Sequence, residues 1–202
     1  MRNLLISIFF SLFAFTSVSV AEEYSTVSLG YTEHTVGFPH DALGTTYYSD
    51  PEDYGFVLGV AFGQRSGDIS TEIETSYYSK VSQKISSFIS ADVKTIASMF
   101  NVMATPGENE FYGIIGGGVG LGYTMIDTGF KADSVTFYGD NNTLNFAHQF
   151  ILGFGSDNYE FVFKNSKFGE VEGGSGTQSN GNDYPPDEFD NEYNSISFRL
   201  KF

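Results

Sequence analysis

Large apolar residues recur at every second position through much of this sequence, and this alternation limits the fold more than any other feature. In residues 54–63 the even positions hold Tyr, Phe, Leu, Val and Phe, and the odd positions hold Gly, Val, Gly, Ala and Gly. Similar alternation occurs in residues 69–77, 111–123 and 144–154. Because successive side chains of a β-strand point to opposite faces, this period predicts strands with one large apolar face. No helical period accompanies it, so we expect an all-β fold.

The alternation predicts eight strands, of which the first covers residues 26–33 and the fourth residues 93–104. Short turns are expected at 64–68, 105–110 and 155–158, and longer polar connections at 34–53, 80–92, 125–142 and 166–192. All 5 prolines fall in these connections, where no ladder hydrogen bond is lost. Short turns at one end and long loops at the other are typical of an eight-stranded antiparallel up-and-down transmembrane β-barrel.

The first residues are typical of a secretory signal peptide. Arg2 supplies a positive charge, residues 4–20 form an apolar run, and small residues precede a cleavage site after Ala21. An uncleaved membrane helix is the alternative, but the run is barely long enough to span a bilayer and no basic cluster follows it. We therefore expect a signal peptide over residues 1–21 and one barrel domain over residues 22–202.

Composition excludes several classes of protein. With no Cys, a disulfide scaffold, a thiolate metal site and an acylated lipoprotein anchor are ruled out. The formal net charge is −15, and removing residues 1–21 with their single Arg gives 9 − 25 = −16. A nucleic-acid partner needs clustered Lys and Arg, so none is expected. No cofactor and no metal site is predicted.

The face opposite the large residues favours a membrane barrel over a soluble one. In a soluble barrel the second face is charged and hydrated, whereas here it holds mainly Gly, Ser, Ala, Thr, Asn and Gln. Such a face suits the narrow lumen of eight strands. The glycines at 116, 118, 120 and 122 are expected to leave space for side chains that point inward from neighbouring strands. Strand glycines can instead mark bulges or bends.

Three segments resemble known bacterial proteins. Residues 194–202 resemble the C-terminal signature of outer-membrane proteins, in which a final Phe follows apolar residues at every second position. These positions are Ile196, Phe198, Leu200 and Phe202. Residues 111–123 and 145–155 resemble the fifth and sixth strands of OmpA-type and Opa-like barrel domains. The resemblance implies a bacterial outer-membrane location, contact with lipid and lipopolysaccharide, and recognition of the last strand by the barrel-assembly machinery.

The inward phase also predicts a set of charges inside the barrel. It consists of Glu72, Glu74, Glu160, Lys164, Arg199 and Lys201. Isolated charges in a lumen too narrow for a water column are costly, so we expect ion pairs and a plugged interior. The seventh and eighth strands are joined by a hairpin and must be neighbours, which is expected to bring Glu160 beside Arg199 or Lys201.

The three histidines are the residues to consider first as candidates for catalysis. His34 and His40 are expected to be solvated loop residues. His148 shares the lipid-facing phase, and some small barrels are lipid A deacylases with a His and a Ser two residues later on that face. Here that position is Phe150, so no catalytic residue is predicted.

Acidic residues gather in the expected loops. One group is Glu33, Asp41, Asp50, Glu52 and Asp53, and the other is Glu170, Glu172, Asp183, Asp187, Glu188, Asp190 and Glu192. They could bind divalent cations, but their spacing matches no calcium motif, and a solvated, self-repelling loop is the preferred interpretation. The sequence thus predicts an outer-membrane barrel with a structural or surface-interaction role through acidic loops. The alternatives are a small porin or channel, and a lipid A-modifying enzyme.

Overall fold

The barrel predicted from the alternation is present. The computed structural model describes residues 21–37, 52–84, 89–106, 111–132, 135–172, 176–177, 183–184 and 188–202. Its barrel strands are β1 (Glu22–Gly37), β2 (Glu52–Ser66), β3 (Ile69–Lys84), β4 (Ile89–Ala104), β5 (Tyr112–Ala132), β6 (Val135–Gly155), β7 (Tyr159–Glu172) and β10 (Glu188–Lys201). The expected signal peptide lies outside the described residues, apart from Ala21.

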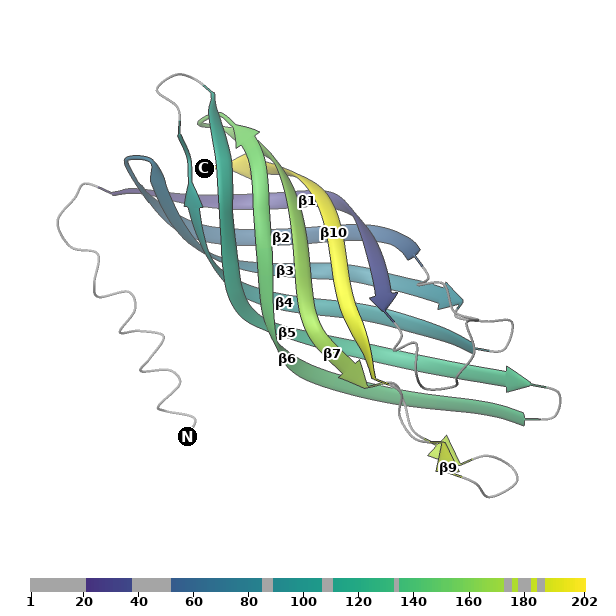
Figure 1. Ribbon diagram of the computed structural model, residues 1–202. Coiled ribbons are helices and arrows are strands. Elements are labelled where there is room, and N and C mark those ends of the chain that lie inside the picture. Colours follow the sequence, from purple (N-terminus) through teal and green to yellow (C-terminus); the bar gives the residue numbers. More distant parts are fainter. Residues whose placement is uncertain are drawn as a thin grey trace, which may run out of the picture.

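Every strand of the barrel is antiparallel to both of its neighbours (Figure 1). The order around the barrel is β1-β10-β7-β6-β5-β4-β3-β2, so β10 returns to β1 and closes the sheet. β8 (Gly176–Thr177) and β9 (Asp183–Tyr184) form a separate two-stranded sheet. Within the described residues no helix is long and apolar enough to cross a bilayer. The all-β, up-and-down barrel is therefore confirmed.

The strands are longer than the alternation predicted. β5 and β6 continue through most of residues 125–142, which were expected to form a long loop, and their ladder extends to the pair Ala132–Val135. The ends of β7 and β10 likewise enter the expected loop at 166–192. Backbone hydrogen bonds do not depend on side-chain polarity, whereas apolar alternation is required only where lipid covers one face. The alternation thus marked the membrane-facing part of each strand and missed its continuation.

The wall of the barrel is apolar outside and largely polar inside. The outer wall exposes large apolar side chains, such as Leu58, Leu152 and Phe198, which are 45 %, 49 % and 39 % exposed. Tyr31 and Tyr54 stack with ring centroids 5.5 Å apart on the same outer face, toward the long loops. A water-soluble protein buries such residues, whereas a bilayer accepts them on a closed sheet whose backbone groups are paired. This surface is that of a protein that spans a membrane.

Glycines on β5 make room in the lumen, as expected. A Cβ at Gly118 would overlap the side-chain oxygen of Asn101, and one at Gly122 would overlap the ring of Phe168. Larger residues at these positions would displace side chains that fill the barrel. The small face of β5 is therefore complementary to large side chains from β4 and β7.

A bulge bends β7 near its end. Gly169 has a φ of 72°, a left-handed conformation that favours glycine, and the register with β10 shifts between Asp190 and Glu192. Phe168 and Val171 both point inward as a result. The ladder between β6 and β7 ends at the pair His148–Lys167. Beyond this pair, β7 follows β10 alone.

Candidate functional site: the filled lumen

Arg199 is the centre of the charged lumen. Its Nη2 lies 2.6 Å from Oε2 of Glu72 and 3.0 Å from Oγ1 of Thr26, and its Nη1 lies 3.0 Å from Oε2 of Glu160. These three charged side chains are at most 7 % exposed. One guanidinium from β10 therefore holds two carboxylates, one from β3 and one from β7.

A second buried ion pair joins Lys164 to Glu74. The amide of Asn101 links it to the first, because its Nδ2 donates to Glu72 Oε1 and to Glu74 Oε2, each at 3.0 Å. Gln149 in turn donates to Oδ1 of Asn101 at 2.7 Å. Side chains from β3, β4, β6, β7 and β10 thus form one continuous polar network across the barrel.

Two tyrosines cover this network on the side of the short turns. Tyr24 donates to Glu72 at 3.2 Å, and Tyr112 donates to Glu160 at 2.8 Å. The guanidinium of Arg65 lies over the Tyr112 ring, 4.5 Å from its centroid. Lys201 does not enter the network: it is partly exposed and its ammonium lies over the Tyr24 ring at 4.6 Å. Cations at the rim therefore pack on aromatic faces, which attract positive charge.

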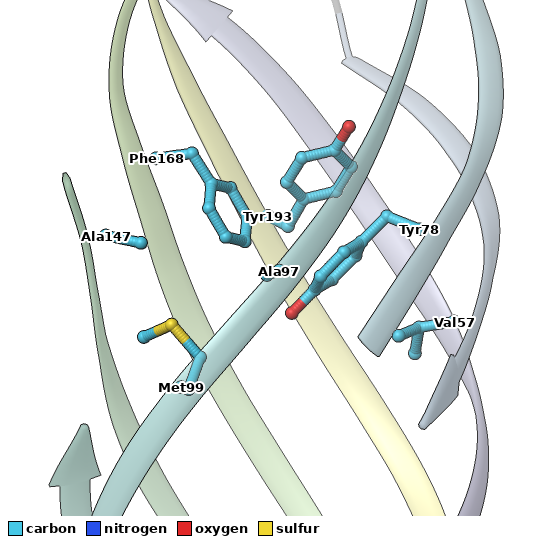
Figure 2. Packing of buried hydrophobic residues seen from close by; sticks show 7 residues of the cluster. All are labelled: Val57, Tyr78, Ala97, Met99, Ala147, Phe168 and Tyr193. Carbon is cyan, nitrogen blue, oxygen red and sulfur yellow. The ribbon is translucent and has the colours of Figure 1, made fainter. Parts of the chain in front are cut away.

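An aromatic cluster fills the lumen on the side of the long loops (Figure 2). It consists of Val57, Tyr78, Ala97, Met99, Ala147, Phe168 and Tyr193. The ring of Tyr193 lies 4.5 Å from that of Tyr78 and 5.5 Å from that of Phe168, centroid to centroid. The hydroxyl groups are also bonded, Tyr78 to Ser166 and Tyr193 to Thr95, each at 3.2 Å. The cluster is a packed layer in which both tyrosine hydroxyl groups have hydrogen-bond partners.

His34 belongs to this end of the lumen, so the expectation of a solvated loop residue is wrong. It is fully buried, its ring stacks on Tyr193 at 4.2 Å, and its Nε2 lies 2.6 Å from Oδ1 of Asn191. The cause is the extra length of β1, whose even-numbered residues face inward as far as His34. His40 lies outside the described residues.

Three layers therefore follow one another along the lumen. Nearest the short turns is an apolar cluster of Met103, Tyr112, Ile114, Ile151 and Val162. The ion-paired network comes next, and the aromatic cluster follows. Sequence reasoning did not identify the aromatic layer, although the inward phase of Tyr78 and Tyr193 would have indicated it if the strands had been extended far enough.

The remaining candidate residues lie on the outer wall. Ile196, Phe198, Leu200 and Phe202 are exposed there, and the backbone of Phe202 exchanges hydrogen bonds with Ser25 of β1 at 2.9 and 3.0 Å. His148 is also exposed, opposite Val119 on β5 and Lys167 on β7.

The acidic residues do not form a single cluster in the part of the chain that the structure describes. Glu192 pairs with Lys167 at 3.1 Å, and Asp53 accepts a hydrogen bond from the backbone of Ser82 at 2.9 Å. Glu170 and Asp190 are exposed, whereas Asp41, Asp50 and Asp187 lie outside the described ranges. Among the described residues no three His, Asp or Glu side chains are placed to hold a metal ion.

Comparison with known proteins identifies the fold. No protein-family model matches the chain, and no curated protein matches its sequence. Ail of Yersinia pestis, solved with the heparin analogue sucrose octasulfate, is 16 % identical with a TM-score of 0.56, over 90 % of this chain and 99 % of Ail. Neisserial surface protein A is 13 % identical with a TM-score of 0.51, over 91 % of this chain and 100 % of that one. Outer membrane protein OprG of Pseudomonas aeruginosa is 11 % identical with a TM-score of 0.55, over 90 % of this chain and 97 % of OprG.

At these identities the likeness concerns the fold. The apolar outer belt, the polar lumen and the closed antiparallel sheet are the features that such barrels share. The chain has the eight-stranded barrel fold of small bacterial outer-membrane proteins, and an outer-membrane location is the one that this fold supports.

Proposed function

We propose that the protein is a non-conducting outer-membrane barrel that acts through its extracellular end. The observation that carries this proposal is the filled lumen, in which Arg199 and Lys164 are buried against Glu72, Glu74 and Glu160. An ion that crossed this region would have to break pairs whose separated charges are costly to leave in a desolvated interior. The packed rings of the aromatic cluster form a second barrier to the passage of an ion.

The shape of the extracellular end supports a role in surface interaction. Strands β5 and β6 continue past the outward apolar positions Tyr123 and Leu144 to Ala132 and Val135. A protein that only stabilised the membrane would not need a sheet that extends beyond it. The extension provides a paired hairpin above the lipid, where recognition can occur.

The charge of the chain supports a particular class of partner. Ail is solved with a sulfated polyanion. A net charge of −16 after removal of residues 1–21, obtained as 9 − 25, repels polyanions and attracts positively charged surfaces. We therefore place a basic partner, rather than a heparin-like one, at the extracellular end of this chain.

Planar-bilayer recording tests the plugged lumen. The full barrel, reconstituted at high protein density, is expected to give no sustained current steps. The triple variant Tyr78→Ala/Phe168→Ala/Arg199→Ala removes side chains from the aromatic cluster and from the ion-paired network. It serves as the positive control for the detection of current steps. Stable, ion-selective steps from the parent protein would contradict the proposal and favour the small-porin alternative. The proposal includes no catalytic step, so a change in lipid A mass that disappears in His148→Ala would contradict it as well.

A further inference from the structure

Two cations lie at the opening of the lumen on the side of the short turns. Arg65 shares the inward phase of Ala61 on β2, and Lys201 continues the inward phase of β10. Both are partly exposed, and each lies over a buried tyrosine ring rather than on the lipid-facing wall. In the part of the chain that the structure describes, neither forms an ion pair. Two positive charges therefore stand at this opening without a carboxylate partner.

Most hydrogen-bond donors of these two side chains have no acceptor among the described residues. Arg65 uses Nε to donate to the backbone oxygen of Gly67 at 3.1 Å and Nη2 to donate to that of Thr105 at 3.3 Å. Since arginine has five N–H donors and lysine has three, Nη1 of Arg65 and the ammonium of Lys201 can bind an outside group. The Arg65 Cζ lies 4.5 Å, and the Lys201 Nζ 5.7 Å, from the centroid of the Tyr112 ring. Both cations thus lie beside one ring, close enough to hold one ligand between them.

The charge balance at this end of the lumen leaves one positive charge. The ion-paired network behind the opening holds three carboxylates and two cations, which are Glu72, Glu74, Glu160, Lys164 and Arg199. With Arg65 and Lys201, four cations face these three carboxylates. An uncompensated charge beside a desolvated interior is costly, so an anion that binds here is favoured. A single carboxylate would make this end of the lumen neutral.

The surroundings of the opening favour a slender ligand over a large anion. Exposed acidic residues lie at the same end and repel an extended polyanion; they include Glu22, Glu23, Asp68 and Asp157. Glu22 lies opposite Arg65 in the β1–β2 ladder. The lumen of eight strands is narrow, so only a thin group reaches both cations. The C-terminal carboxylate of a peptide chain is such a group, because it carries one negative charge at the tip of an extended chain.

We propose that the opening of the lumen at the short-turn end binds the C-terminal carboxylate of a peptide chain between Arg65 and Lys201. The guanidinium and the ammonium donate to the carboxylate oxygens, and the rings of Tyr24 and Tyr112 support the two cations. Short turns of outer-membrane barrels face the periplasm, so the ligand is a periplasmic chain. The inference goes beyond the role proposed for the extracellular end and does not depend on it, because the two sites lie at opposite ends of the barrel.

The probe is an acetylated four-residue peptide of Gly, Ser and Ala with a free C-terminal carboxylate. It is titrated at low salt against the full, isotope-labelled barrel in nanodiscs of zwitterionic lipid, and NMR shifts of the Arg65 Nε–H are the readout. One control peptide has a C-terminal amide, and the other carries three Glu residues in addition to the free C-terminus. Saturable binding of the probe is expected, at least fivefold weaker for the amide and no tighter for the Glu-rich peptide. Equal binding of the amide, tighter binding of the Glu-rich peptide, or no binding of the probe would overturn the proposal.

Matched variants place the binding site on the protein. Lys201→Gln and Arg65→Gln are each expected to weaken binding at least fivefold, with backbone amide shifts as the readout for the second. Lys167→Gln, at the other end of the barrel, is expected to bind like the parent, and Glu22→Gln is expected to bind more tightly because it removes an acid opposite Arg65. Heat-modifiable gel mobility shows which variants fold, and Lys201→Gln carries the test if Arg65→Gln does not. Unchanged binding in the folded rim variants, or an equal loss in Lys167→Gln, would contradict the proposed site.

Discussion

Arg199 on β10 lies 2.6 Å from Glu72 on β3, although these two strands are not neighbours in the barrel. The contact crosses the lumen, and both side chains are at most 1 % exposed. Arg199 also holds Glu160 on the adjacent β7. A single side chain thus links two strands that are not neighbours, and its removal leaves two buried carboxylates without their cation.

The first prediction concerns this link. Arg199→Ala is expected to lower the free energy of unfolding by ~3–5 kcal/mol, because buried charges are left without a partner. Adding Glu72→Gln should recover part of the loss, since one of the stranded charges is then removed. Urea titration in phospholipid vesicles, followed by gel mobility of the folded form, measures the difference. Lys201→Ala is the control, because Lys201 lies at the partly exposed rim, and an equal loss in both variants would contradict this role of Arg199.

The second prediction concerns the lipid-facing wall. Leu152 is 49 % exposed on the outer face of β6. Leu152→Arg is expected to cost ~1–4 kcal/mol in the same vesicles, because a charge on the lipid-facing wall of a barrel is destabilising, most strongly at the midplane. Asp157→Arg, in the exposed turn between β6 and β7, should change stability little. If the two variants unfold at the same urea concentration as the parent, the assigned outer phase is wrong.

The third prediction compares two glycines of β5. A Cβ at Gly118 would overlap Asn101, whose amide links both ion pairs, whereas a Cβ at Gly113 meets no atom within 4 Å. Gly118→Ala is expected to cost about 1–3 kcal/mol through overpacking, and Gly113→Ala should be nearly neutral. Thermal unfolding followed by circular dichroism measures both. Equal effects would show that the lumen is not packed as described.

The fourth prediction concerns assembly through the last strand. Phe202→Ser, or deletion of Phe202, is expected to reduce the amount of barrel in the outer membrane and to increase degradation in the periplasm. The reason is the exposed row that ends at Phe202, which the barrel-assembly machinery is proposed to recognise. Phe202→Tyr keeps an aromatic ring and should insert normally. Outer-membrane levels are measured by fractionation and immunoblotting. Equal levels for Phe202→Ser and Phe202→Tyr would contradict a role of the Phe202 ring in assembly.

Local patterns in the sequence predicted the barrel, the outward phase and a position for Glu160 beside Arg199 or Lys201, because all three depend on alternation and on hairpin neighbours. The contact between Arg199 and Glu72 could not be predicted in this way. It depends on the register of every pair of neighbouring strands around the barrel. The sequence pattern of a single strand does not determine this register. The burial of His34 was missed for a different reason: beyond the lipid, paired strands no longer need apolar residues, so the pattern fades while the strand continues.

The seam between β1 and β10 gives the barrel a particular order of events during folding. Thr26 and Arg199, which bond across this seam, are separated by 173 positions in the chain. Local hairpins can form early, but the cylinder cannot close until the last strand has been synthesised and brought to the first. Contacts between residues so far apart in the sequence form slowly, because closing the long loop between them costs conformational entropy. We therefore expect an open sheet, with one edge of each terminal strand unpaired, as the long-lived species that folding helpers in the periplasm must protect.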